Sequence, residues 1–219
     1  MNLKEIVRKE LLSEQGKKSD VIRKLIRDII IVFKNEEEGE FFLPEYFKER
    51  QEMLYDFMTM GETFTLELTI EINDEIDTFK VNGESYYSEG TIVVKIEYNQ
   101  KNKNKILYDL IGELNELVAH ELRHIDQNIA GTFVSRSYRG KDNVKYYTQP
   151  KELDAQVFGF KRLSGLTRRP FEEVAINWFE THRDIHQLDD NGIKKVLNKL
   201  FKFEKYGEIT NWKKEIIWK

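Results

Sequence analysis

The sequence predicts an α+β fold, and two kinds of hydrophobic pattern support this prediction. Two segments, FTLELTIEI and TIVVKIEY, alternate apolar with polar or charged residues, which is typical of strands with one buried face. Segments with apolar residues at helical spacing precede and follow them. We therefore expect helices at both ends of the chain and an antiparallel sheet between them, with one face on the core and the other largely wet.

The first third of the chain has helical patterns. Asn2 and Glu5 can form a capping box for a short first helix. Apolar residues repeat with helical spacing over residues 21–33 and predict a second helix. Pro44 suits the first turn of a third helix, which Gly61 would end.

The two alternating segments, residues 64–72 and 92–98, predict the strands of the sheet. Between them, Asn82 and Gly83 predict a hairpin turn, because these two residue types tolerate the positive φ angles that tight turns need. We therefore expect neighbouring strands to run in opposite directions.

The second half of the chain is expected to be mostly helical. A long helical pattern covers residues 106–129, and the polar, tyrosine-rich segment 131–150 is typical of an extended loop. A further helix is expected over residues 150–163, with Gly165 as its stop. The chain from Pro170 onward again has helical patterns.

Composition restricts the class of protein. The 219 residues include no cysteine, so disulfides, thiolate ligands and a cysteine nucleophile are excluded. The net charge of -4 argues against a nucleic-acid partner, since phosphate binding needs a concentrated basic surface. We find no pattern of a signal peptide or of a transmembrane segment, and we expect a cytoplasmic protein with no membrane partner.

We expect a single domain over residues 1–219. It would have a helical N-terminal part (1–61), a core (62–165) and a helical C-terminal part (166–219). This length is sufficient for a sizeable hydrophobic core. The sequence leaves the oligomeric state open.

The segment LVAHELRHI, within the long helix, has the clearest chemical signature. His120 and His124 are one helical turn apart, so both imidazoles project from one face and can reach one metal ion. Glu121 can reach a water on that metal without being a ligand itself, as in the HExxH arrangement. The plainer alternative is a helix whose two histidines make only structural hydrogen bonds.

A catalytic zinc site needs a third protein ligand and one open position. With no cysteine in the chain, that ligand must be Asp, Glu or His. The next helix begins PKELDAQVF and offers Glu152, with Ala155 and Phe158 spaced to pack this helix against the first. Asp154 is the alternative third ligand.

The pattern HELRH followed by ELDAQVF resembles the gluzincin class of zinc metallopeptidases. It is similar to the ImmA/IrrE-like branch and to small HExxH proteins of tailed phages, over about residues 90–165. The resemblance implies a zincin-like fold, in which an edge strand is followed by the HExxH helix and by a second helix that carries the glutamate. It also implies one zinc ion per chain, held by His120, His124 and Glu152, and hydrolysis of a peptide or protein substrate with Glu121 as general base.

The resemblance suggests further roles around the site. It implies that the strand over residues 92–98 is the edge strand and pairs with an extended substrate. Tyr147 is the candidate second donor to the oxyanion, with Tyr146 or a histidine of the tail as alternatives. Arg123 and Asp126 depart from the family pattern, which has an uncharged and an apolar residue at these positions, and we expect both on the solvated surface.

Three other features have plainer interpretations. His182 and His186 form a second pair at helical spacing but lack the glutamate after the first histidine, so a partly exposed helix end is favoured over a second metal site. The basic segments KNKNK and SRSYRGK are interpreted as solvated loops in preference to a nucleic-acid contact. Trp178, Trp212 and Trp218 fall in the expected C-terminal helices, and packing in the core or against a partner is the default interpretation.

The function that the sequence favours is that of a zinc metalloendopeptidase. The alternative comes from another class: a phage-type structural or interaction protein that retains the zincin fold and the metal without significant turnover. Composition does not separate the two, whereas the chemistry of Glu121 does, because only the peptidase needs a base at that position.

Overall fold

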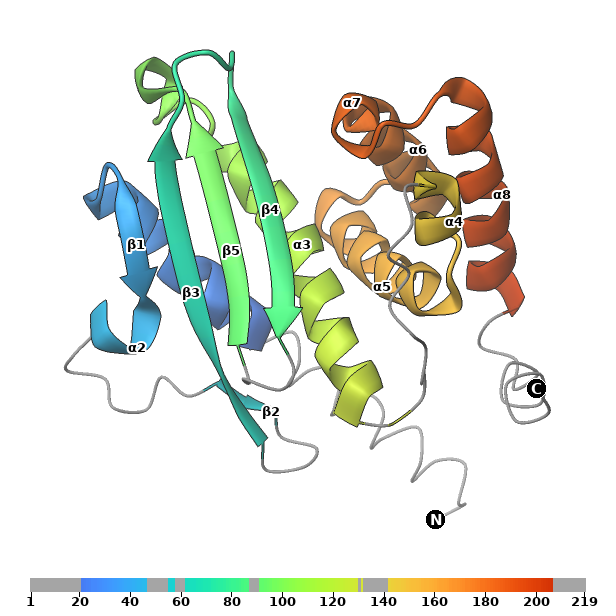
Figure 1. Cartoon of the computed structure of the whole chain (residues 1–219), viewed down its shortest axis with the longest axis horizontal. Helices are drawn as coiled ribbons and strands as arrows, with labels where there is room; N and C mark the ends of the chain where they lie inside the picture. The colour runs from blue at the N-terminus through green and yellow to red at the C-terminus, as the bar shows by residue number, and fades with distance from the viewer. Residues whose placement is uncertain are drawn as a thin grey trace. The chain divides into compact units, whose positions relative to one another are not determined.

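The computed structural model describes residues 21–46, 55–57, 62–86, 91–129, 131 and 142–206, and Figure 1 shows their helices and strands. The chain divides into two compact units, Met1–Glu121 and Leu122–Lys219. The border falls inside helix α3 (Leu107–Ile129), which continues through it without a break. The expected first helix, the segment SRSYRGK and the last two tryptophans lie outside the described residues.

The first unit contains a mixed β-sheet. Its strands follow the order β1 (Gly39–Phe42), β3 (Glu62–Ile72), β5 (Thr91–Tyr98) and β4 (Phe79–Tyr86), and β2 (Tyr55–Phe57) pairs with the beginning of β3. The two predicted strands are thus confirmed as β3 and β5, and the α+β class is confirmed with them.

The prediction of a purely antiparallel sheet is wrong at the centre. Strands β3 and β5 run parallel, with Leu68 opposite Val94, while β4 is antiparallel to β5. The chain goes from β3 to the far side of the sheet, forms β4, and then returns as β5 between the two. Alternation predicts which side chains are buried, and it has the same form in a parallel and in an antiparallel strand, so it could not indicate the direction of pairing.

Strand β5 is therefore not the predicted edge strand, because β3 and β4 occupy both of its edges. Its backbone groups already pair with these neighbours, so the predicted strand addition of a substrate along β5 is wrong. The strand at this end of the order is β4.

The predicted hairpin turn at Asn82 and Gly83 is also wrong, because both residues lie inside β4. Gly83 pairs with Val94 of β5. A Cβ atom at Gly83 would meet Cγ and both Cδ atoms of Leu117 at 3.0 Å, so the glycine allows α3 to approach the strand closely. The sequence signal of a turn here reflects a packing requirement.

The buried face of the sheet packs against two helices of the same unit. Phe33, on the helix over residues 21–35, packs edge-on against Tyr98 with ring centroids 5.0 Å apart. Leu117 of α3 packs against Gly83, whose partner Val94 is on the same face of β5 as Tyr98. Both helices therefore cover one face, and Figure 1 shows them behind the strands. The side chains buried on this face are Leu66, Leu68, Ile70, Ile92, Val94, Ile96 and Tyr98.

The opposite face is wetter, as predicted. Lys95 lies there with Nζ 2.8 Å from Glu71 and 3.4 Å from Glu97, and all three side chains are partly exposed. In the segment KNKNK, Lys103 donates to the carbonyl of Glu36 at 2.6 Å and lies over the Phe33 ring. This lysine has a structural contact within the unit.

The third predicted helix, from Pro44 to Gly61, is wrong. Helix α2 (Leu43–Tyr46) begins there, but residues 55–57 form strand β2. The preceding strand β1 was not predicted at all. Both strands pair with β3 along its length, and such long-range pairing leaves little trace in a short sequence window.

The described residues of the second unit are helical apart from their connections. After the end of α3 it contains α4 (Asn143–Tyr147), α5 (Pro150–Thr167), α6 (Phe171–Thr181), α7 (Arg183–His186) and α8 (Asp190–Tyr206). Its core is made of the residues Leu153, Phe160, Val174, Ala175, Phe179, Leu188, Ile193, Val196, Leu200 and Phe203. Within the described ranges, no helix has the length and apolar character needed to cross a membrane.

Two local predictions in this unit need correction. The expected loop over residues 131–150 contains α4, whose N-cap Asp142 accepts a hydrogen bond from the Lys145 amide at 3.0 Å. Gly165 does not stop α5, which continues to Thr167 and ends at Arg168 with φ 58°. A Cβ at Gly165 would meet no atom within 4 Å, so this glycine lies at an exposed position within the helix.

Candidate metal centre

Helix α3 presents the two predicted histidines. The helix packs through an apolar stripe that includes Leu110, Leu114 and Val118, all fully buried. His120 and His124 lie beside this stripe, one turn apart, so their rings project from the same side of the helix. His124 is buried, whereas His120 is partly exposed.

Helix α5 supplies the third group. Pro150 occupies its first turn, where the missing amide hydrogen costs nothing, and Gln149 is its N-cap residue. Glu152 follows in the same turn and is 6% exposed. A carboxylate at this position is stabilised by the positive end of the helix dipole, which offsets part of the cost of its burial.

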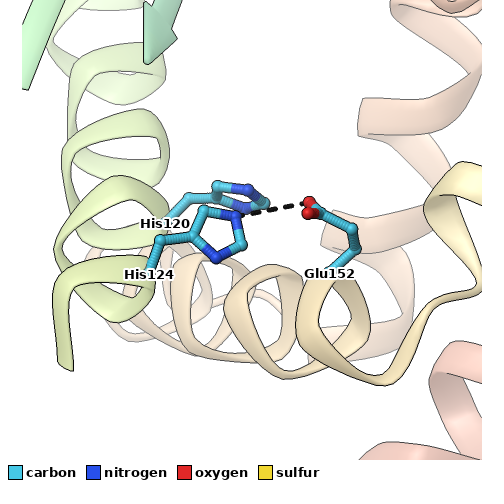
Figure 2. A group of neighbouring side chains, drawn as sticks. All are labelled: His120, His124 and Glu152. Carbon is cyan, nitrogen blue, oxygen red and sulfur yellow. Dashed lines mark ion pairs between the residues drawn. The ribbon is translucent and has the colours of Figure 1, made fainter. Parts of the chain in front are cut away.

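The structure brings His120, His124 and Glu152 together. One ligand atom from each residue lies within 4.8 Å of the others, and Figure 2 shows both imidazoles turned toward the carboxylate. Nε2 of His124 and Oε2 of Glu152 are 3.3 Å apart. Two ligands at 2.0–2.1 Å from a tetrahedral zinc ion are about 3.4 Å apart, so this spacing fits a shared metal ion.

Asp154, the alternative third ligand, is not part of this group. Its carboxylate accepts hydrogen bonds from Nε and Nη2 of Arg123 at 2.7 and 3.2 Å, and from Nε2 of Gln127 at 2.8 Å. Among the described residues, the group whose ligand atoms converge contains Glu152 and not Asp154. Residues two positions apart on a helix project about 200° apart around its axis, so Glu152 and Asp154 meet different side chains of α3.

The two departures from the family pattern, Arg123 and Asp126, are not simply solvated. Nη1 of Arg123 lies 3.6 Å from Asp126, and the guanidinium is 5.8 Å from the centre of the Phe158 ring. Burial alone would lower the pKa of Arg123, but its hydrogen bonds with Asp154 and Asp126 and their charges raise that pKa above its ordinary value. Arg123 and Asp126 are three residues apart, a spacing at which opposite charges on a helix can pair, so the sequence could have indicated this contact.

Sequence reasoning missed two polar residues on the same side of α3. Gln127 is 2% exposed and its Oε1 lies 3.0 Å from Nδ1 of His124. Glu116 stands one turn before His120 and is 3% exposed. Its burial, and then the charges of Glu113 and Glu121, raise the pKa of the Glu116 carboxyl well above 4.5. The sequence could have indicated both residues, because polar residues recur at every third or fourth position along this side of α3.

Glu121, the predicted general base, is on α3 directly after His120. Its side chain is 7% exposed. Adjacent residues on a helix project about 100° apart around its axis, so Glu121 is not aligned with His120 and His124, and its role as general base stays a prediction.

Tyr147, the predicted oxyanion donor, lies on α4 among aromatic residues. Its hydroxyl is hydrogen-bonded to Nδ1 of His186, and its ring packs edge-on against Phe179 and Tyr146. Its role as a donor to the oxyanion stays a prediction.

The second histidine pair packs around an indole. The ring of Trp178 stacks on His182 and on His186, with centroids 4.7 Å apart in both cases. Both histidines are partly buried, and over the described part of the chain they do not join a converging group of three metal-binding side chains. Of the two predicted alternatives for Trp178, core packing is confirmed by its contacts with Phe160 and Phe179.

A comparison with protein-family models found no matching family, and searches of curated proteins and of solved structures found no match. The chemistry of the site therefore rests on its own geometry. What that geometry provides is two imidazoles and one carboxylate close enough to bind a metal ion.

Proposed function

We propose that the protein is a zinc-dependent endopeptidase that hydrolyses peptide bonds in a peptide or protein substrate. One observation carries the proposal. Ligand atoms of His120, His124 and Glu152 lie within 4.8 Å of one another, and the buried Glu121 directly follows His120 in the chain. Three converging ligands and an adjacent base are the set that metal-assisted hydrolysis requires.

The donor atoms fit zinc better than the common alternatives. Imidazole nitrogen is a preferred ligand of zinc, whereas calcium and magnesium prefer shells made only of oxygen. Three protein ligands leave one position of a tetrahedron open, which distinguishes a catalytic from a structural zinc site. The absence of cysteine from the chain excludes the sulfur ligands that most structural sites use.

A zinc ion bound there would supply Lewis acidity, which lowers the pKa of a water ligand and polarises the carbonyl of the peptide bond. Glu121 takes up one proton of the attacking water at its carboxylate. The water oxygen forms a bond with the carbonyl carbon, and the bond between carbon and nitrogen breaks. Glu121 then returns the proton to the leaving nitrogen, so the products are a carboxylic acid and an amine.

Substitution of Glu121 by Gln tests the proposal. We expect zinc-loaded wild type to cleave members of a mixed peptide library, detected by mass spectrometry, and E121Q to cleave none above background. E121Q should still contain one zinc ion per chain, because Glu121 is not a ligand. Cleavage by E121Q at the wild-type rate would overturn the mechanism.

Wild type that binds zinc but cleaves no peptide, in a library that covers all residue types, would overturn the peptidase assignment. The metal centre itself would stand in that case, and the protein would belong with metal-binding proteins that lack turnover. His120→Ala provides the matched control, since it should lose both zinc and cleavage.

A further inference from the structure

The hydrogen bonds of Gln127 fix the orientation of its side-chain amide. Nε2 lies 2.9 Å from the carbonyl oxygen of Lys151 and 2.8 Å from Oδ2 of Asp154. Both of these atoms can only accept hydrogen bonds, so the nitrogen of the amide must face them. Oε1 then faces Nδ1 of His124 at 3.0 Å.

This orientation determines the tautomer of His124. Amide oxygen accepts and cannot donate, so Nδ1 of His124 must carry the hydrogen. In a neutral imidazole the other nitrogen, Nε2, then holds the free electron pair that binds a metal. Nε2 is also the atom that lies 3.3 Å from Glu152.

We propose that Gln127 is a positioning residue of the metal centre, which holds His124 in the tautomer and ring orientation that binds zinc. The inference rests on the proposed zinc site and does not depend on which substrate is cleaved. The ring nitrogen of a metal-binding histidine that does not bind the metal generally donates its hydrogen to such a partner. Loss of the partner weakens metal affinity by roughly 10- to 100-fold.

The same network holds α5 against this part of α3. Asp154 accepts from Gln127 and from Arg123, and the carbonyl that Gln127 binds belongs to Lys151. Residues 151 and 154 flank Glu152 on α5. Gln127 therefore contacts α5 on either side of Glu152 while it orients His124, so one side chain sets the relation between two ligands.

A buried glutamine suits this role because it offers both a donor and an acceptor. Glutamate at position 127 would still accept from His124, but it would place a negative oxygen against Asp154 and the Lys151 carbonyl. Methionine has a similar length and fills the same space without a strong donor or acceptor, so Gln127→Met removes the hydrogen bonds with little change in packing.

The experiment measures zinc affinity by competition with a chelator for wild type, Q127M and Asn115→Leu. Asn115 is a buried polar residue of the same helix that donates to the Ile111 carbonyl at 2.7 Å, so its variant controls for the loss of a buried polar group. We expect the Kd for Zn²⁺ to rise about 10- to 100-fold in Q127M and to stay within about twofold in N115L. An unchanged Kd in Q127M, or an equal rise in N115L, would overturn the inference.

A second measurement needs no variant. Long-range ¹H–¹⁵N correlation spectra of zinc-loaded wild type should show hydrogen on Nδ1 of His124 and zinc on Nε2, and the reverse pattern would overturn the inference. The two proposals fail separately. Peptide cleavage that survives with an unchanged Kd in Q127M removes the role of Gln127 alone, whereas a raised Kd without any cleavage by wild type removes the peptidase alone.

Discussion

Arg123 holds the carboxylate of Asp154 with two hydrogen bonds, of 2.7 Å to Oδ2 and 3.2 Å to Oδ1. This pairing occupies both oxygens of the carboxylate that stands two residues after Glu152. Charge-assisted bonds of this two-point geometry are stronger than neutral ones and fix direction as well as distance. Asp154 is thereby held as a structural partner, and Glu152 is left to face the histidines.

Replacement of Glu152 and of Asp154 by Ala should therefore have different effects on zinc. We expect the zinc affinity of E152A to fall by more than about 100-fold, because a direct ligand is lost. Removal of a residue that only hydrogen-bonds to a ligand costs up to roughly 100-fold. D154A should keep one zinc ion per chain with a smaller loss of affinity. Elemental analysis and chelator competition measure both quantities, and the opposite order would reassign the third ligand to Asp154.

Replacement of Glu116 by Gln should change the pH dependence of stability. Burial raises the folded-state pKa of Glu116 well above 4.5, so the folded protein binds this proton more tightly than the unfolded chain. The associated stability is present at low pH and is lost as pH rises from about 4.5 through the raised pKa. The loss is about 1.4 kcal/mol for every tenfold difference in proton affinity between the folded and unfolded states. E116Q should lack this decline.

Urea unfolding between about pH 4 and 8, with a zinc chelator in every sample, measures this difference. The free energy of unfolding of E116Q minus that of wild type should increase as pH rises. A difference that stays constant with pH would contradict the prediction.

Replacement of Gly83 by Ala should destabilise the fold. The new Cβ would meet three atoms of Leu117 at 3.0 Å, and such overpacking costs about 1–3 kcal/mol. Alanine also restricts the unfolded chain, which offsets up to about 1 kcal/mol of this cost. Gly112→Ala, on α3 with no atom within 4 Å of the new Cβ, should stabilise by about 0.5–1 kcal/mol. Thermal unfolding compares the two, and a stabilised G83A would contradict the close approach of α3 to β4.

Replacement of Gly165 by Ala tests whether α5 continues through this residue. Inside a helix, and with open space around the new Cβ, alanine should stabilise by about 0.5–1 kcal/mol. If Gly165 instead ended the helix in a left-handed conformation, alanine would destabilise. The sign of the change in denaturant unfolding distinguishes the two.

Local patterns were sufficient for elements that bury one face. The alternation around Leu68 and Val94 predicted β3 and β5, and the long helical period predicted α3 almost to the residue. The order and direction of the strands were not predictable in this way. The same alternation fits either direction of pairing. Gly83 is typical of a turn in the sequence, but in the fold it is needed because Leu117 of α3 packs closely against it.

The sequence by itself determined the pair of histidines and their adjacent glutamate, since helical geometry fixes how residues one turn apart project. Only the tertiary structure decided between Glu152 and Asp154, and only it brought Gln127 against Lys151 and Asp154 of α5. The reason is physical. Spacing along one helix is a local property of the backbone, whereas the side of α5 that faces α3 depends on how the two helices pack, through contacts that no single segment contains.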